Sequence, residues 1–175
     1  RYIFDPYTGG NSIKLETESV KLLWQTEKSL VKYLDLRDGK VSFYLAEAKA
    51  EDDSDEPTNM VMEGNALIGG YDKAGKLIWS WHIWVTNGDP REETITLNGE
   101  EMMSRNLGAF TNSNSSTDGA EIFRSYGMYY QWGRKDPFPR PLYYNASGAY
   151  DEDRYNENGT YIKEVFAERN ATNGT

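Results

Sequence analysis

The pattern that most constrains the fold is a two-residue alternation of apolar and polar side chains on either side of Asp38-Gly39. Asp-Gly favours a type I′ turn, because both central residues of that turn need positive φ. The facing pairs on the apolar side are then Leu36 with Val41, Leu34 with Phe43 and Lys32 with Leu45. One face of the pair is largely apolar, so register and alternation agree. The sequence therefore predicts an antiparallel hairpin with one buried face.

A second hairpin is predicted around the four-residue loop Asp72-Lys73-Ala74-Gly75, with strands over residues 65–71 and 77–85. The second of these strands is apolar nearly throughout, which is typical of a central strand. With four residues in the loop, the facing pairs are Ile68 with Trp79 and Ala66 with Trp81. Smaller side chains then lie opposite bulky indoles, and we expect both tryptophans in the core.

Composition limits the classes of function. The 175 residues suit one domain of ordinary size or two small ones, and a 14% share of aromatic residues indicates a folded protein. The net charge of −9 repels phosphate, so we expect neither nucleic acid nor an anionic membrane as a partner. The absence of cysteine excludes disulfides, thiolate metal sites and cysteine nucleophiles. No apolar run approaches the ~20 residues of a membrane span, so we expect no membrane insertion by this chain.

Turn-forming residues at 86–90, Thr-Asn-Gly-Asp-Pro, predict a domain boundary. We expect residues 1–86 to form an antiparallel β-sandwich, immunoglobulin-like in general form, and residues 87–175 to form a loop-rich region. The whole chain is therefore predicted to be mainly β. The expected local elements of the second region are a strand at 94–97, a turn at Asn98-Gly99, a surface loop at 111–118 and a short helix at 164–169.

Three stretches of the sequence share their order and spacing with a known family: residues 77–86 with Trp79-Ser80-Trp81-His82, residues 103–109, and residues 127–138 with Gln131-Trp132-Gly133-Arg134-Lys135-Asp136-Pro137-Phe138. Over roughly residues 64–140 the chain resembles the Fibrobacter succinogenes major paralogous domain family, found in surface proteins of Bacteroides and its relatives. The resemblance implies a C-type-lectin-like fold for the second region. It also implies an extracellular or cell-surface location, at the outer membrane of a Bacteroides-like bacterium.

Two features depart from the family's pattern. Ser104 stands where the family usually has Asp, and the chain ends at Thr175, before a later segment of the family domain that contains Cys and Trp. A lectin-like fold normally closes by pairing its two ends, and half of it would leave an exposed sheet edge. We therefore expect either that the chain is truncated or that this member of the family ends differently, and that another chain or a missing segment completes the lectin-like region.

Tyrosines are concentrated in the second region. Eight of them fall between positions 126 and 161: Tyr126, Tyr129, Tyr130, Tyr143, Tyr144, Tyr150, Tyr155 and Tyr161. A ring with a polar tip suits surfaces that bind protein or sugar, although loop-rich folds also pack tyrosines across their loops. The predicted ligand-binding residues are Tyr143, Tyr144, Tyr150, Tyr155, Arg134 and Arg140. For Arg134-Lys135-Asp136 the alternative is an internal charge pairing that pins the loop after Trp132.

A second set of residues offers oxygen ligands in a loop, which calcium prefers: Asp151, Asp153, Asn156 and Asn158. Their spacing does not match an EF-hand, and the alternative is a solvated loop. No other cofactor is expected.

The only histidine, His82, lies on the strand face of Ile78, Ser80 and Trp84, which the predicted register places opposite Asn65. With no cysteine and no second histidine, a zinc site would need carboxylates alone as its other ligands, which is unusual. We expect a hydrogen-bonded structural histidine. Since no pair of nucleophile and base can be named, we also expect that the protein is not an enzyme.

Together these features predict a non-catalytic binding or adhesion module of the bacterial cell surface, with a glycan or a host or bacterial surface protein as its partner. One alternative is an assembly subunit of a surface filament or complex. Another is a surface glycosidase that uses paired carboxylates.

Overall fold

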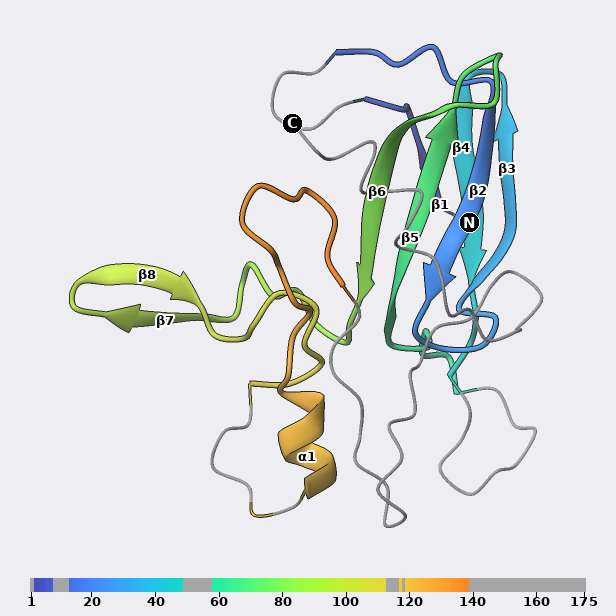
Figure 1. Cartoon of the computed structure of the whole chain (residues 1–175). Helices are drawn as coiled ribbons and strands as arrows, with labels where there is room; N and C mark the ends of the chain where they lie inside the picture. The colour runs from blue at the N-terminus through green and yellow to red at the C-terminus, as the bar shows by residue number, and fades with distance from the viewer. Residues whose placement is uncertain (1, 8–12, 49–57, 113–116, 118, 139–175) are drawn as a thin grey trace, which may run out of the picture.

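The computed structural model describes residues 2–7, 13–48, 58–112, 117 and 119–138. As predicted, the described part of the chain is mainly β and its strand pairings are antiparallel, and within this part the only helix is α1 (Figure 1). The described elements are β1 (Tyr2–Phe4), β2 (Ser19–Gln25), β3 (Val31–Arg37), β4 (Lys40–Leu45), β5 (Gly64–Tyr71), β6 (Leu77–Val85), β7 (Thr94–Leu97), β8 (Glu100–Met103) and α1 (Gly119–Arg124). No helix in the described part is long and apolar enough to cross a membrane.

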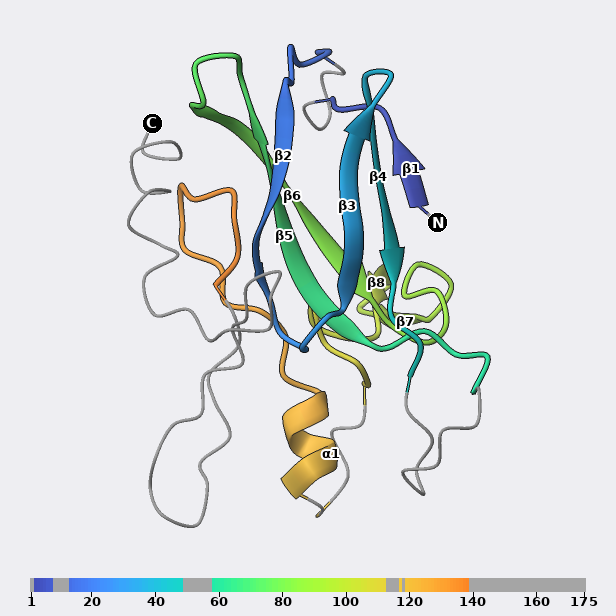
Figure 2. The ribbon, with the colours of Figure 1, turned by 90° about the vertical axis from the view of Figure 1, so that its right-hand side faces the viewer.

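Two three-stranded sheets, with strand orders β1-β4-β3 and β2-β5-β6, face each other (Figure 2). One hydrophobic cluster takes its buried residues from both sheets and from the turn between β2 and β3: Leu22, Leu30, Val31, Phe43, Ala66, Ile68 and Val85. Ala66 and Ile68 are two positions apart on β5, so both point to the same face of their sheet. This shared cluster is the main core of the molecule.

The outer face of the β2-β5-β6 sheet is also covered. Leu67, which points away from the main core, packs with Trp24 and Met128 in a second hydrophobic cluster. Met128 belongs to the second half of the chain, so the segment around Met128 lies against the outer face of this sheet. As a result β5 is buried along its whole length.

β6 was predicted as a central strand because it is apolar, and this prediction is wrong. β6 lies at the edge of its sheet, and β5 is the central strand. The apolar composition of β6 has a different cause: both of its faces are partly covered, and most of its residues are half-buried. The sequence distinguishes a strand with two covered faces, but it does not show whether that strand has one neighbour or two.

The first hairpin has the predicted turn but not the full predicted register. Asp38 and Gly39 have φ values of 52° and 69°, as a type I′ turn requires. Leu36 lies opposite Val41, as predicted, but Val31 rather than Lys32 lies opposite Leu45. The cause is a β-bulge at Tyr33 and Leu34, where Tyr33 has a φ of 53°. A bulge inserts one extra residue and shifts every pairing beyond it.

The predicted register of the second hairpin is wrong by two positions. The observed pairs are Gly70 with Trp79, Ile68 with Trp81, Ala66 with Ile83 and Leu67 with His82. One position of the shift comes from a shorter loop, because the Asp72 N–H donates to the Lys76 carbonyl (3.0 Å) and leaves three loop residues. The Asp72 carboxylate also accepts from the N–H groups of Ala74 and Lys76, both at 2.9 Å. The other position comes from a bulge beside Gly70.

The tryptophans also differ from the prediction. Trp24, rather than Trp79 or Trp81, is the fully buried indole. Trp81 packs at the margin of the main core against Phe4, with ring centroids 5.2 Å apart. A side chain on Gly70 would not fit there, because its Cβ would lie 2.8 Å from Trp81. Trp79 lies beneath the ammonium of Lys135, 4.7 Å from the ring centroid.

In the second region the expected strand at 94–97 and the turn at Asn98-Gly99 are confirmed, with φ values of 53° and 87°. The strand pairs with β8 in a two-stranded sheet. The helix α1 was not predicted. The helix expected at 164–169 lies outside the described residues.

Candidate functional site

Two hydrogen bonds fix the turn at Gly108 and Ala109 to the outer face of the β2-β5-β6 sheet. The Asn65 side-chain amide donates to the Gly108 carbonyl (3.0 Å), and the Trp84 indole N–H donates to the Ala109 carbonyl (3.1 Å). Both partners are backbone groups of one turn, and both donors are largely shielded from water. A buried amide left without a partner is costly, so these bonds define where the turn sits.

His82 is hydrogen-bonded, as predicted, since its Nε2 lies 2.9 Å from Asn65 Oδ1. The contact to Gly108 orients the Asn65 amide, so its oxygen faces the imidazole and Nε2 must donate. The hydrogen-bond partner is Asn65, although Leu67 is the residue opposite His82 in the ladder. Burial lowers the pKa of His82 to about 4, while Asp136 raises it and Lys135 lowers it.

The internal pairing expected within Arg134-Lys135-Asp136 is confirmed for Lys135 and Asp136, whose Nζ and Oδ1 lie 2.7 Å apart. The structure adds Ser80 of β6, which the sequence did not connect to this loop. Ser80 Oγ donates to Asp136 Oδ1 (2.6 Å), and Lys135 Nζ donates to the hydroxyl and the carbonyl of Ser80 (2.6 and 2.8 Å). The Asp136 side chain is buried.

This cluster of Ser80, Lys135 and Asp136 holds a loop rather than preparing a nucleophile. An activated serine needs a neighbouring base that can take its proton. Here the hydroxyl donates to a carboxylate that an ammonium already neutralises. The cluster therefore attaches the loop before Phe138 to the edge strand β6.

Arg134, one of the predicted ligand-binding residues, makes contacts within its own loop. Its guanidinium lies over the Phe138 ring, 4.0 Å from the centroid, and Nε donates to the Asp136 carbonyl (3.2 Å). Desolvation lowers the pKa of Arg134. The other predicted ligand-binding residues lie outside the described residues: Arg140, Tyr143, Tyr144, Tyr150 and Tyr155. The same holds for the calcium candidates Asp151, Asp153, Asn156 and Asn158.

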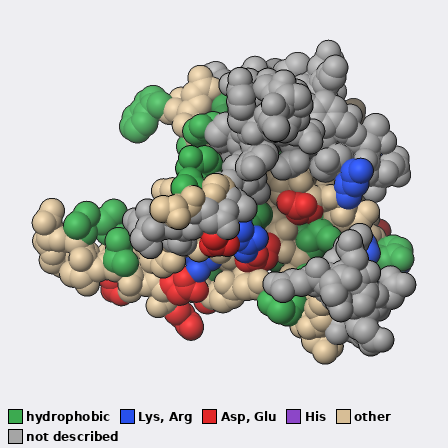
Figure 3. Space-filling view, turned by 90° about the horizontal axis from the view of Figure 1, so that it is seen from below, with side chains coloured by type: hydrophobic (Ala, Val, Ile, Leu, Met, Phe, Trp, Pro, Cys, Tyr) green, Lys and Arg blue, Asp and Glu red, His purple; other side chains and the backbone are tan. Residues whose placement is uncertain are grey.

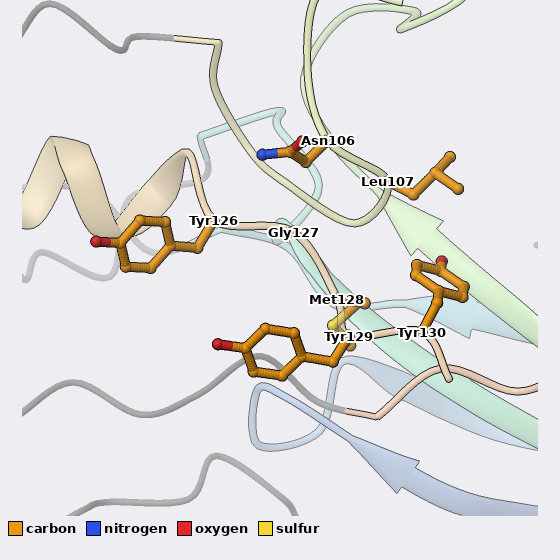
Figure 4. Close-up of a pocket in the computed structure, with 7 residues that line it drawn as sticks. All are labelled: Asn106, Leu107, Tyr126, Gly127, Met128, Tyr129 and Tyr130. Carbon is orange, nitrogen blue, oxygen red and sulfur yellow. The ribbon is translucent and has the colours of Figure 1, made fainter. Parts of the chain in front are cut away.

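A groove of about 510 Å³ opens beside the turn that contains Gly108. We call it the tyrosine groove, and it is lined by Asn106, Leu107, Tyr126, Gly127, Met128, Tyr129 and Tyr130. Figure 4 shows Tyr126 and Tyr129 projecting to the same side with their hydroxyls outermost, while Tyr130 points to the other side, toward Leu107. All three rings are about half exposed. Partial burial raises the pKa of Tyr130 above its ordinary value.

Backbone hydrogen bonds hold the segment that carries the groove tyrosines to two neighbouring segments. The Met128 N–H donates to the Leu107 carbonyl (2.8 Å), and Met128 itself is buried in the second hydrophobic cluster. Tyr129 and Phe138 exchange two backbone hydrogen bonds, at 3.1 and 2.8 Å. The rings are therefore presented from a segment that is fixed to the sheet before a ligand arrives.

The bridge between Tyr129 and Phe138 also closes a loop that carries Trp132 at full exposure, the orange loop of Figure 1. The turn is closed by the Arg134 N–H, which donates to the Gln131 carbonyl (3.0 Å), and Gly133 supplies a φ of 76°. An indole has the largest apolar surface of any side chain. A fully exposed indole on a loop that is fixed at both ends is typical of a residue that contacts a binding partner.

The sequence contained part of the signal for this groove. Tyr126, Tyr129 and Tyr130 belong to the tyrosine-rich stretch, but the prediction favoured its later members. Met128 is the apolar residue among these tyrosines, and it indicates that one face of the segment packs against the core. Nothing near Asn106 and Leu107 in the sequence indicates that they complete the groove, because that depends on the packing of the two segments.

Within the described ranges, no three His, Cys, Asp or Glu side chains are grouped so that they could hold a metal ion. No protein-family model matches the chain, and no curated protein and no solved structure is significantly similar to it.

Proposed function

We propose that this chain is a non-catalytic binding module of the bacterial cell surface, and that it binds carbohydrate in the tyrosine groove, with Trp132 of the following loop as a further contact. The observation that carries the proposal is the group of three half-exposed tyrosines on one fixed segment, which continues along the chain into the loop that carries the fully exposed Trp132. A sugar ring offers one apolar face and a rim of hydroxyls. Aromatic faces with polar tips match both parts.

In this proposal the two facing sheets form an immunoglobulin-like β-sandwich, and this sandwich supports a C-type-lectin-like region. The resemblance of residues 64–140 to the Bacteroides surface-protein family supports that division and the surface location. Because the groove is held by Met128 and by the bridge between Tyr129 and Phe138, little ordering is needed on binding.

The carboxylates described near the sheet favour binding over glycoside hydrolysis. A glycosidase needs one carboxyl that can give up a proton and a second that can act as a base or nucleophile. Glu63 and Asp136, the shielded carboxylates here, lie 2.6 Å from Arg124 and 2.7 Å from Lys135. Each of these two carboxylates is therefore paired with a cation, and neither of them lines the tyrosine groove.

A glycan array probed with the labelled chain tests the proposal. We expect binding to a restricted set of glycans, and a loss of about tenfold or more in affinity for Tyr126→Ala and Tyr129→Ala. A matched control is Tyr33→Asn, which removes a more exposed ring from β3, and Asn tolerates the positive φ of that position. The pair Tyr143→Ala and Tyr144→Ala tests the tyrosines outside the described residues. Absence of glycan binding, or equal binding by the groove variants and the control, would refute the proposal.

A further inference from the structure

The hairpin of β7 and β8 projects away from the two larger sheets (Figure 1). In the described part of the chain each of these strands pairs only with the other. Two-stranded hairpins are marginal in water unless another strand or a packed face supports them. Their outer edges also carry backbone groups that a further strand can pair with.

The two faces of this hairpin differ in character. Ile95 and Leu97 alternate along β7, Met102 lies opposite Ile95 and Glu100 lies opposite Leu97, so one face carries three apolar side chains with Glu100 at the turn end. Ile95, Leu97 and Met102 are exposed by 50%, 55% and 49%. The other face carries Thr94, Thr96 and Glu101, with Met103 at the base opposite Thr94, and the Thr94 hydroxyl donates to the Glu101 carboxylate (2.6 Å). Figure 3 shows the hydrophobic side chains gathered on this projecting arm.

The base of the hairpin is firmly attached. The buried guanidinium of Arg105 pairs with Glu93 and donates to the Thr86 hydroxyl (3.0 Å) and the Phe110 carbonyl (2.8 Å). The Ser104 N–H donates to the Glu93 carbonyl (2.9 Å). The apolar face also continues into a groove of about 640 Å³ at the base, which Ile95 and Met102 help to line. The exposed apolar face therefore belongs to a hairpin whose base is fixed to the rest of the molecule.

Charge decides among the possible occupants of this face. Residues 89–103 carry five carboxylates and one guanidinium, a net charge of −4 on one arm of a chain whose total is −9. A second copy of the chain would bring the same negative arm and the same negative total, and would be repelled. A strand with alternating apolar and basic residues fits both faces at once: its apolar side chains would extend the face of Ile95 and Leu97, and its basic side chains would lie on the side of Glu101.

We propose that the hairpin is a docking site for an extended, basic segment of a partner protein, which adds to the β7–β8 sheet as a third strand. The face of Ile95, Leu97 and Met102 contains no residue that lines the tyrosine groove, although the groove at the base of the hairpin shares Asn106 and Leu107 with it. The docking proposal does not depend on the carbohydrate proposal. Under the two proposals together, the β7–β8 hairpin binds a protein and the tyrosine groove beside the sheet binds a glycan.

The test uses two synthetic peptides of eight residues, one alternating Val with Lys and one alternating Val with Glu, titrated against the full chain by fluorescence anisotropy. We expect the Lys peptide to bind and the Glu peptide not to bind, with weaker binding as salt is raised. We also expect slower amide exchange at residues 94–103 when the Lys peptide is present. The double variant Ile95→Thr with Leu97→Thr keeps the preference for a strand but removes the apolar face, and should weaken binding about tenfold or more.

Controls separate this site from simple charge attraction and from the tyrosine groove. Met60→Thr removes a side chain that is as exposed as Met102, from a different part of the surface, and should leave binding unchanged. Tyr129→Ala should also leave it unchanged. Equal binding of the Lys peptide to the Ile95 and Leu97 variant, or no binding at all, would overturn the proposal. So would sedimentation that shows a dimer of the chain lost in that variant, because the occupant would then be a second copy.

Discussion

Acidification should destabilise the protein through His82. The imidazole is buried and donates to Asn65, and its pKa is lowered from 6.5 to about 4. Between these two pH values the unfolded chain binds a proton at His82 that the folded chain does not bind. Stability therefore rises with pH across this window, is fully present above pH 6.5, and is lost as the pH falls toward 4. At 1.36 kcal/mol for each pH unit, this difference in pKa corresponds to about 3 kcal/mol.

His82 is the only histidine, so its titration can be followed directly. The ring resonances in an NMR titration should keep their neutral position through pH 6 and shift with a midpoint near 4. In parallel, urea unfolding is measured from pH 7 to pH 4 for the wild type and for His82→Gln. A glutamine amide can still donate to Asn65 Oδ1 but does not titrate, so carboxylates contribute equally to both proteins.

The expected result is a wild-type free energy of unfolding that falls by about 3 kcal/mol more than that of His82→Gln over this range. Two results would contradict the reasoning: a ring that titrates near its ordinary pKa, or two stability profiles that run parallel. Either one would mean that water reaches the imidazole, and that the contact with Asn65 does not shield it.

Two further substitutions test the contacts that hold the second half of the chain. Ser80→Ala removes the hydroxyl donor of the buried Asp136 carboxylate and should lower the free energy of urea unfolding by about 1–3 kcal/mol; an unchanged midpoint would mean that Lys135 alone satisfies the carboxylate. Gly108→Ala adds a Cβ that would overlap Met128 at a φ of 87° and should cost more than Gly75→Ala, where φ is 77° but the space is open. Equal melting temperatures for the two alanine variants would show that Met128 can move aside.

Local turns were the part of the fold that could be predicted, and the reason is that their requirement is local. Asp38-Gly39 and Asn98-Gly99 need positive φ at both positions, and these residue pairs tolerate it at little cost. A bulge caused the register error in the first hairpin, and a bulge together with a shorter loop caused it in the second. A bulge at Tyr33 is not signalled by any glycine, and the Asp72 carboxylate that shortens the second loop could equally have faced solvent.

The candidate site was less accessible to prediction because its contacts join residues that are far apart in the sequence. Asn65 meets Gly108 at a separation of 43 residues, and Ser80 meets Asp136 at 56. Alternation identifies which face of a strand is buried, but it does not identify what buries it. The tyrosine stretch was visible, whereas the choice of Tyr126, Tyr129 and Tyr130 follows from the packing of Met128 on Leu67 and Trp24.

The polar residues on the outer face of the sheet give these distant contacts their specificity. An apolar face would accept a covering segment at several positions, because sliding by two residues presents a similar surface. On β6, Ser80 and His82 share one face, and each has a polar partner, Asp136 and Asn65 respectively. Moving the covering loop by two residues would take Asp136 away from Ser80 and leave a buried carboxylate without its donor, which is far more costly than a change in apolar contact. The two polar side chains in an otherwise apolar strand therefore select one docking position, and with it the position of the loop that presents Trp132.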